Sequence, residues 1–589
     1  MTIEKLTNSE VLQIEAQVDR HFDRTSLPTS DLNTARWVVC AVNEDVNRLA
    51  LLDAVKTWYR EDARANRARF VGRLDRSKYA LRHALDLCAK HLPLTNVCGL
   101  IHFNAENYTP ACHLLASAEE FAAATRVFSA YHAKALELSI DRETGLISAL
   151  QEKWASHYGS LEYVLNADKG EFSPVILLVN LFSGPSFEMP GVNSFGGWGP
   201  TIYEIVKRAR LKKGRIHYQL IKRFARELFE EFNVTPSLLS KKWVFPWGTM
   251  PEAQSYFAAL QAVSVYHRLS VHFGSIRRLN GRGVDQICLN TEARRLNADL
   301  ARVSGLPIRT VEAVTDALTL GSGTTTPDPA LQPLVPIGDA RLAVPGSVIL
   351  SSKWSRNMLS LHARVAEDSF NANSAAFEQT MISVLESELP ARFIHRTSIN
   401  IPTSKGPEEI DLLLIDKNAR SILLGELRWM LQPGDVREVL NRKKVIREKV
   451  KQAHRKLAGA RAATDEVVQQ LGLPPGAWTI NAVVIIDGFG GTVSDRPKDI
   501  PVVPRDVFIR VVDAALDLDH AHAVMTTPLW LPREGFDFER QWAPTTMCGI
   551  SYNRPGIDFG HRSYIRESLQ QYLAEAFKFS VPELRSMPW

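Results

Sequence analysis

The stretch EEIDLLLIDKNARSILLGELRW, residues 408–429, decides how the C-terminal half of this chain is expected to fold. Both of its apolar runs are rich in residues that favour β-strands, and KNAR between them fits a turn, so the pattern predicts a β-hairpin. With the turn centred between Asn418 and Ala419, Asp411 lies directly opposite Glu426. Opposed residues of an antiparallel pair point to the same face, so the hairpin brings two carboxylates together.

Two carboxylates so close repel each other unless a cation lies between them. Converging oxygen ligands suit a hard divalent ion, so Asp411 and Glu426 predict a site for Mg²⁺, or for Mn²⁺ in its place. Arg428 shares the face of Glu426, because strand side chains alternate with period two, and its guanidinium can stabilise charge on a phosphodiester. The same residues also fit an ordinary hairpin, in which Asp411 opens a strand and Glu426 and Arg428 form a solvated ion pair.

The segments around the hairpin predict an α/β unit. The expected elements, in order, are an amphipathic helix at 375–390, a strand at 392–402, the two hairpin strands, a helix at 441–461, a buried strand at 478–487, and a short strand that enters a helix at 500–516. Glu378 is expected near the start of the first of these helices.

This order of elements, with the motif Asp411-(x14)-Glu426-x-Arg428, resembles the PD-(D/E)xK, or restriction-endonuclease-like, nuclease superfamily. The resemblance covers roughly residues 370–520, about a quarter of the chain. It implies an α/β domain with a mixed central sheet and a Mg²⁺- or Mn²⁺-dependent endonuclease in which Asp411 and Glu426 are metal ligands. The implied substrate is DNA, with RNA as an open alternative.

The resemblance also implies roles for Glu378, which would complete the metal site, and for Gln452, which would be a supporting polar residue. The chain departs from the motif at Ile410, where proline is usual, and at Arg428, where the motif has lysine. Some branches of the superfamily supply this lysine from elsewhere, and others have lost catalysis and only bind. The nearby candidates for a displaced lysine are Lys443, Lys444 and Lys449.

The helix expected at 441–461 is strongly basic, with Glu448 as its acid. Placed beside the hairpin, it can contact phosphates by charge and by counterion release. The residues expected to make these contacts are Lys443, Lys444, Arg447, Lys449, Lys451 and Arg455. A solvated charged face explains the same pattern without any ligand.

Composition sets the broad class of protein. The chain has 589 residues, 45% of them hydrophobic, and a formal net charge of +5, which is the balance of a globular protein and too small a charge to prove a polyanionic partner. Six dispersed cysteines fit a reducing compartment, and no signal peptide or membrane-spanning run is evident, so a cytoplasmic protein without a membrane partner is expected. Motifs of P-loop, GxSxG and HExxH enzymes are absent.

The sequence therefore predicts an α+β multidomain chain. Residues 1–320 are expected to be mostly helical, of unknown fold, with a break near 172–200 between two subdomains. The Gly-, Thr- and Pro-rich segment 321–346 is expected to be a linker, and 347–589 to form the nuclease-like domain.

Two other functions remain open beside a metal-dependent nuclease. One is a catalytically inactive, nuclease-like protein that binds nucleic acid or supports an assembly, with Arg428 marking a decayed site. The other is an enzyme whose chemistry lies in the first half of the chain. Association by family adds a restriction or antiviral defence role, as a homodimer or with a partner subunit.

Overall fold

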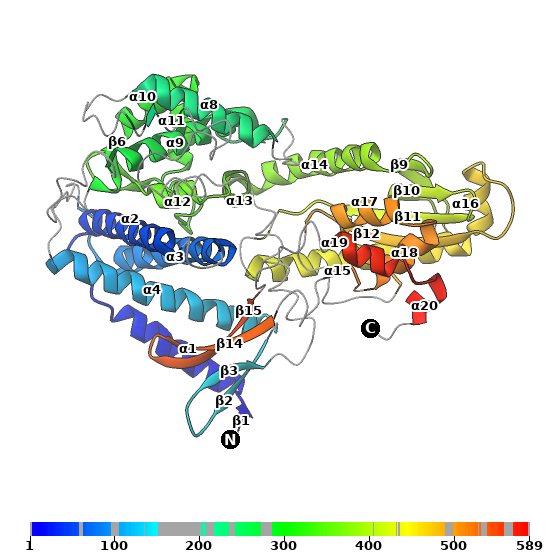
Figure 1. The fold of residues 1–589 in the computed structure, drawn as a ribbon, viewed down its shortest axis with the longest axis horizontal. Coiled ribbons are helices and arrows are strands. Elements are labelled where there is room, and N and C mark those ends of the chain that lie inside the picture. Colours follow the sequence, from blue (N-terminus) through cyan, green and yellow to red (C-terminus); the bar gives the residue numbers. More distant parts are fainter. Residues whose placement is uncertain are drawn as a thin grey trace.

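The fold is taken from a computed structural model of the chain. The structure describes residues 3–57, 63–95, 105–134, 136–150, 201, 204–205, 207, 217–234, 242–271, 286–403, 406–431, 433, 436–488, 499–527, 529–531, 539–558 and 569–586. It is an α+β multidomain protein with a mostly helical N-terminal part and a C-terminal mixed sheet, as the sequence predicts (Figure 1). The break expected near 172–200 lies outside the described residues.

The N-terminal part is built from two groups of helices (Figure 1). The first group comprises α1 (Asn8–Asp23), α2 (Leu32–Thr57), α3 (Ala63–His91) and α4 (Ala105–His132). The second comprises α8 (Tyr218–Val234), α9 (Met250–Ser270), α10 (Ala293–Ser304), α11 (Ile308–Ala317), α12 (Gly346–Leu350) and α13 (Trp354–Val365). Helix α9 is buried along most of its length and packs against α8, α10 and α12, so it is the central helix of the second group.

The segment expected to be a linker, 321–346, is instead part of this N-terminal fold. It contributes β7 (Val335–Pro336) and β8 (Arg341–Val344), and β8 pairs with both β7 and β6 (Leu289–Glu292). The buried Gln332 side chain explains how a segment rich in Gly and Pro can be ordered. Its amide donates to the carbonyls of Ala317 and Ser322 and accepts from the Gly321 amide, so it replaces missing backbone hydrogen bonds.

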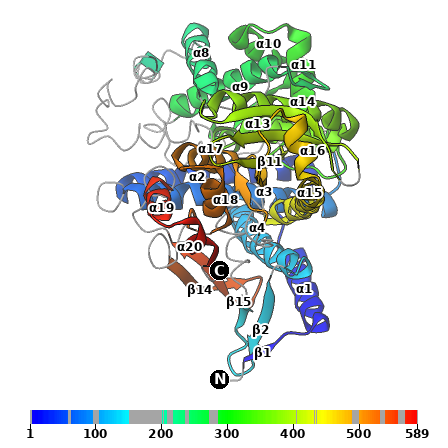
Figure 2. The same cartoon turned by 90° about the vertical axis from the view of Figure 1, so that its right-hand side faces the viewer.

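The segment 347–589, which was expected to form one nuclease-like domain, does not stay together in one sheet. Strands β14 (Glu539–Met547) and β15 (Ile550–Asp558) return to the N-terminal part and complete a five-stranded sheet in the order β1-β2-β3-β15-β14 (Figures 1 and 2). The other members of this sheet are β1 (Ile3–Lys5), β2 (Glu137–Asp141) and β3 (Ile147–Leu150). Strand β15 runs parallel to β3, so residues from the two ends of the chain share one sheet.

The C-terminal sheet confirms the order of elements predicted from the sequence. Its strands are β9 (Ile394–Ile401), β10 (Glu408–Asp416), β11 (Ser421–Arg428), β12 (Thr479–Ile486) and β13 (Val502–Pro504). Strands β9, β10 and β11 are antiparallel neighbours, whereas β11, β12 and β13 are parallel, which makes the sheet mixed.

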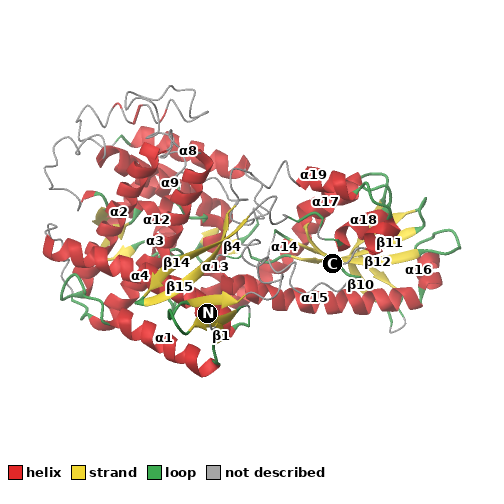
Figure 3. Cartoon of the chain, turned by 60° about the horizontal axis from the view of Figure 1, so that its bottom comes forward, coloured by secondary structure: helices red, strands yellow, loops and turns green. Residues whose placement is uncertain are grey.

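Helices cover both faces of this sheet, as Figure 3 shows. The helices of this part of the chain are α14 (Glu367–Glu388), α15 (Val436–Ala462), α16 (Thr464–Gln470), α17 (Arg505–Ala514), α18 (Leu518–Thr526), α19 (Leu569–Ala576) and α20 (Val581–Ser586). Alternate residues of β11 enter two different cores, with Leu424 in the core that α15 covers and Leu423 in the core that α17 and α18 cover. A strand buried on both faces reads as a continuous apolar run, so the charged Glu426 within it is exceptional.

Helix α15 also connects the two parts of the molecule. It packs on β11 and β12 and contacts α4 of the N-terminal part (Figures 1 and 2). No helix within the described ranges is long and apolar enough to cross a membrane.

Candidate functional site

The candidate site begins with the register of the β10–β11 hairpin. Leu412 pairs with Gly425 and Asp416 with Ser421, which is the register predicted from a turn centred between residues 418 and 419. The turn is held by the Asp416 carboxylate, whose Oδ1 accepts hydrogen bonds from the amides of Asn418 at 2.9 Å and Ala419 at 3.0 Å. An Asp that caps its own turn in this way fixes the loop length and therefore the register.

One step beyond the last ladder pair, this register places Asp411 opposite Glu426. Asp411 Oδ2 accepts a hydrogen bond from the Leu427 amide at 2.8 Å, so the carboxylate is anchored to the end of β11. Gly425 keeps the strands close here, since a Cβ atom at this position would lie only 3.2 Å from Leu412 Cβ. The hairpin register therefore fixes the position of Asp411 relative to Glu426.

Two lysines of α15 provide positive charge at the acid pair. Lys449 Nζ lies 3.7 Å from Asp411 Oδ2 and 3.6 Å from Glu426 Oε2. Lys456 Nζ lies 2.5 Å from Glu426 Oε1 and donates to the Glu409 carbonyl at the same distance. The two lysines are seven residues apart, which is about two helical turns, so they project from one face of the helix. The charge of Lys449 therefore offsets the repulsion between the two carboxylates, and the Mg²⁺ or Mn²⁺ expected between them stays a prediction.

Burial makes Glu426 the unusual member of this pair, because it is 1% exposed. Burial, followed by the charge of Asp411, raises the pKa of Glu426 above its usual range, while Lys456 and Lys449 oppose that change. Within the described residues Glu426 Oε2 has no hydrogen-bond partner, and a buried acceptor in that state is costly. Two oxygen ligands with an unsatisfied acceptor fit a hard divalent cation.

Glu378 does not join the two acids. Arg428 Nη1 forms an ion pair with Glu378 Oε1 at 2.8 Å. Among the residues that the structure describes, no group of three or more His, Cys, Asp or Glu side chains is arranged to hold a metal ion. Helix α14 begins at Glu367, so Glu378 lies near its middle and not near its start as expected, because residues 367–374 continue the helix without Gly or Pro.

Gln452 lies on α15 between the two site lysines, one turn after Lys449, and is half-buried. Its supporting role, which the resemblance implied, stays a prediction.

The cations expected to contact phosphate divide into two groups. Lys449 lies at the acid pair, whereas Lys444, Arg447, Lys451 and Arg455 are exposed. These four recur at spacings of three or four residues and form one stripe along α15. Part of their charge is already matched, since Arg455 is paired with Glu408 at 2.7 Å and Lys451 with Glu448 at 2.8 Å. Lys443 is half-buried.

Lys456 was missed as a site residue by sequence reasoning, which counted it only within the basic helix. A signal was present, because Lys456 shares the apolar face of α15 with Ala453, Leu457 and Ala460. A lysine at a core position needs a buried partner, and Glu426 is the acid that interrupts the apolar run of β11.

Comparisons of the chain with protein-family models, with curated proteins and with solved structures found no match.

Proposed function

We propose that this protein is a metal-dependent nuclease of the PD-(D/E)xK type, which hydrolyses phosphodiester bonds in DNA. The observation that carries the proposal is the Asp411–Glu426 pair, held at the end of a hairpin and faced by the amino group of Lys449. The element order around it supports the same assignment. The arrangement combines two oxygen ligands and an amine in one place, which is what charge stabilisation at a phosphodiester requires.

In this proposal Asp411 and Glu426 would hold Mg²⁺ or Mn²⁺. Such an ion supplies Lewis-acid chemistry and lowers the pKa of a bound water. Lys449 takes the place of the motif lysine, since it is 17% exposed and lies at both acids, whereas Lys456 is sealed beneath Glu426. Lys449 would therefore move from the acids to the phosphate when metal and substrate bind, and its charge would stabilise the transition state.

The remaining parts of the site would position the substrate. The exposed stripe Lys444, Arg447, Lys451 and Arg455 extends over eleven residues, or about 16 Å of helix, which is long enough for several phosphate contacts. At Arg428, Nη1 is held by Glu378, and within the described residues Nε has no hydrogen-bond partner. Because Nε is buried, only the exposed part of the guanidinium, on a side chain that is 39% exposed, would reach a phosphate oxygen.

A second candidate function is supported by the same ammonium group. Lys449 already neutralises both acids, and a site in which the chain's own lysine replaces the metal would be catalytically inactive. The protein would then bind nucleic acid or support an assembly through the stripe on α15. The proposal includes a defence role in the cytoplasm, in which the protein would act alone or with a partner. The described cysteines are all free thiols, which fits that compartment.

The decisive experiment incubates the full chain with plasmid DNA, single-stranded DNA and RNA, with Mg²⁺, with Mn²⁺ and with chelator. We expect metal-dependent cleavage that Asp411→Asn or Glu426→Gln lowers by about a hundredfold or more, as loss of a ligand should cost at least as much as loss of a residue that supports one. Glu448→Gln, an exposed acid on α15, is the matched control and should cleave normally. Binding without cleavage under every metal would favour the second candidate, and equal cleavage by all three variants would place the activity elsewhere.

A further inference from the structure

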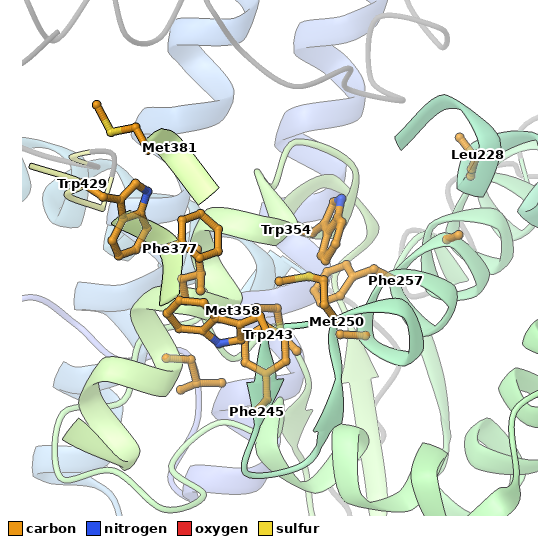
Figure 4. Close-up of a cluster of buried hydrophobic side chains, with 14 of the residues drawn as sticks. Leu228, Trp243, Phe245, Met250, Phe257, Trp354, Met358, Phe377, Met381 and Trp429 are labelled. Carbon is orange, nitrogen blue, oxygen red and sulfur yellow. The ribbon is translucent and has the colours of Figure 1, made fainter. Parts of the chain in front are cut away.

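A buried aromatic cluster lies where the N-terminal part meets the C-terminal domain (Figure 4). Its centre is Trp243, which is 2% exposed. The Trp243 ring lies 5.1 Å from Phe377, 5.4 Å from Phe370 and 5.9 Å from Trp429, measured between centroids. Trp243 precedes the short hairpin of β4 (Val244–Phe245) and β5 (Gly248–Thr249), which belongs to the N-terminal part, whereas the other three rings come from α14 and the end of β11.

Directional hydrogen bonds fix this hairpin on the neighbouring helices. Trp243 Nε1 donates to His362 Nδ1 of α13 at 3.1 Å. The side-chain amide of Asn373, on α14, accepts from the Val244 amide at 3.3 Å and donates to the Val244 carbonyl at 3.4 Å, as a neighbouring strand would do. Trp243 therefore has a defined orientation and is more than a filler of apolar space.

The far side of the cluster supports the candidate site. Phe377 immediately precedes Glu378, and Trp429 immediately follows Arg428. The Phe377 and Trp429 rings lie 4.7 Å apart, and the Glu378–Arg428 ion pair joins the same two segments at 2.8 Å. Helix α14 and the end of β11 are thus joined by two neighbouring contacts, one between aromatic rings and one between charged side chains.

We propose that Trp243 is a positioning residue of the C-terminal site, which holds the Glu378–Arg428 pair in place through Phe377 and Trp429. The inference rests on the proposed function, because Arg428 borders the acid pair at which cleavage would occur. It adds that the helical part of the chain is a working part of the nuclease. A displacement of the β4–β5 hairpin would move Phe377 and Trp429 together. The guanidinium of Arg428 would then shift relative to the acid pair.

The physical reason is that a close-packed cluster transmits shape more faithfully than a flexible contact. Rings in edge-to-face contact have few alternative arrangements at the same density. Trp243→Phe would leave a smaller ring and remove the donor to His362, so the cluster would loosen without the loss of its apolar character. Such small misplacements lower the rate of a reaction more than they weaken the binding of its substrate.

The test compares Trp243→Phe with Trp354→Phe in the full chain. Trp354 is a matched control, because it is also buried, at 4% exposed, but packs on Phe257 of α9, across the cluster in Figure 4 from Phe377 and Trp429. We expect Trp243→Phe to lower kcat about tenfold with little change in KM, and Trp354→Phe to leave kcat unchanged. Equal effects of the two variants on kcat would overturn the proposal.

A second arm asks whether Trp243 acts through the ion pair and needs no enzymatic activity. Glu378→Gln is introduced into the wild type, into Trp243→Phe and into Trp354→Phe, and the midpoint of urea unfolding is measured for each. We expect the shift caused by Glu378→Gln to fall to about half in Trp243→Phe and to stay whole in Trp354→Phe, since coupled residues are not additive. A full shift in Trp243→Phe would refute the inference. An inactive wild type would sink the proposed function alone, because this cycle would still be measurable.

Discussion

Lys456 and Glu426 form a buried ion pair, with Nζ 2.5 Å from Oε1 and side chains that are 6% and 1% exposed. The pair joins α15 to β11, the central strand of the sheet, and Glu426 is also a member of the acid pair. Burying two charges is costly, and the cost is offset only when the geometry is good and the other hydrogen bonds are made. Lys456 meets that condition through its second bond, to the Glu409 carbonyl.

Replacement of Lys456 by Met should destabilise the protein strongly. The change leaves Glu426 buried without its closest partner, and breaking a buried pair from one side costs about 3–5 kcal/mol of unfolding free energy. The measurement is urea unfolding of the full chain at neutral pH. Lys451→Met is the control on the same helix, because its ion pair with Glu448 is exposed, and it should leave stability nearly unchanged. Similar losses in both variants would show that the Lys456–Glu426 pair is not the cause.

Replacement of Lys449 by Ala should strengthen the binding of Mn²⁺ to the site. The ammonium group lies within 4 Å of both acids and competes with any other cation there. We expect the dissociation constant to fall about tenfold, which corresponds to about 1.4 kcal/mol. Calorimetric titration of Mn²⁺ into the protein measures this, and Lys444→Ala, an exposed lysine of the same helix, should bind as the wild type does. Unchanged or weaker binding in Lys449→Ala would argue that the acids do not hold the metal.

Protonation of the buried His522 should lower the unfolding free energy of the protein as the pH falls. Burial lowers the pKa of His522 from 6.5 to about 4, with the charges of Arg585 and Arg461 acting in the same direction. The unfolded chain then binds more protons than the folded chain between these two values, so stability is lost as pH falls through this window. A pKa lowered from 6.5 to about 4 corresponds to a loss of about 3 kcal/mol of unfolding free energy once the pH has fallen below both values.

Urea unfolding of His522→Gln at pH 7, 6 and 5 tests this expectation. The variant should lose less stability than the wild type over this range. His454→Gln, which removes a half-buried histidine of α15, should follow the wild type. A wild-type slope in His522→Gln would assign the acid sensitivity to other groups.

Gly459 should resist substitution although it lies within a helix. A Cβ atom at Gly459 would lie 2.6 Å from Thr403 Cβ, so α15 can approach the turn between β9 and β10 only because this side chain is missing. Gly459→Ala should therefore destabilise the protein by about 1–3 kcal/mol, despite the better helix propensity of Ala. In contrast, Ala458→Gly at the neighbouring exposed position should cost about 1 kcal/mol from propensity alone. Thermal unfolding measures both, and a stabilised Gly459→Ala would contradict the close approach.

The sequence by itself determined the local architecture of the C-terminal domain. The two apolar runs rich in β-forming residues and the turn KNAR at residues 417–420 were enough to predict the register that opposes Asp411 and Glu426. Most of the order of helices and strands from 375 to 516 was also predictable, because each element carries its own period and its own breaks, but the short helix α16 was not predicted. These features depend on neighbours in the chain.

Only the tertiary structure decided which charges meet. The basic helix offered many candidates, and the way in which α15 packs on β11 and β12 selects Lys449 and Lys456 for the acids and leaves the stripe exposed. Arg428 was expected beside the acids and is paired with Glu378 of α14. These are contacts between elements, which a local pattern does not encode.

The division of the chain into domains also depends on contacts between segments that are far apart in the sequence. Strand β14 contains Pro544 and β15 contains Pro555, residues that argue against a strand when the sequence is read locally. Pro544 is tolerated because β14 lies at the edge of the sheet that the two ends of the chain build together. Pro555 lies beyond Tyr552 and Asn553, the described residues of β15 that pair with β3. The segment 321–346 is ordered by Gln332 and by its pairing with β6, which a count of Gly and Pro cannot reveal. Period and turn chemistry are properties of a few consecutive residues, whereas pairing across the chain depends on which surfaces are left to bury.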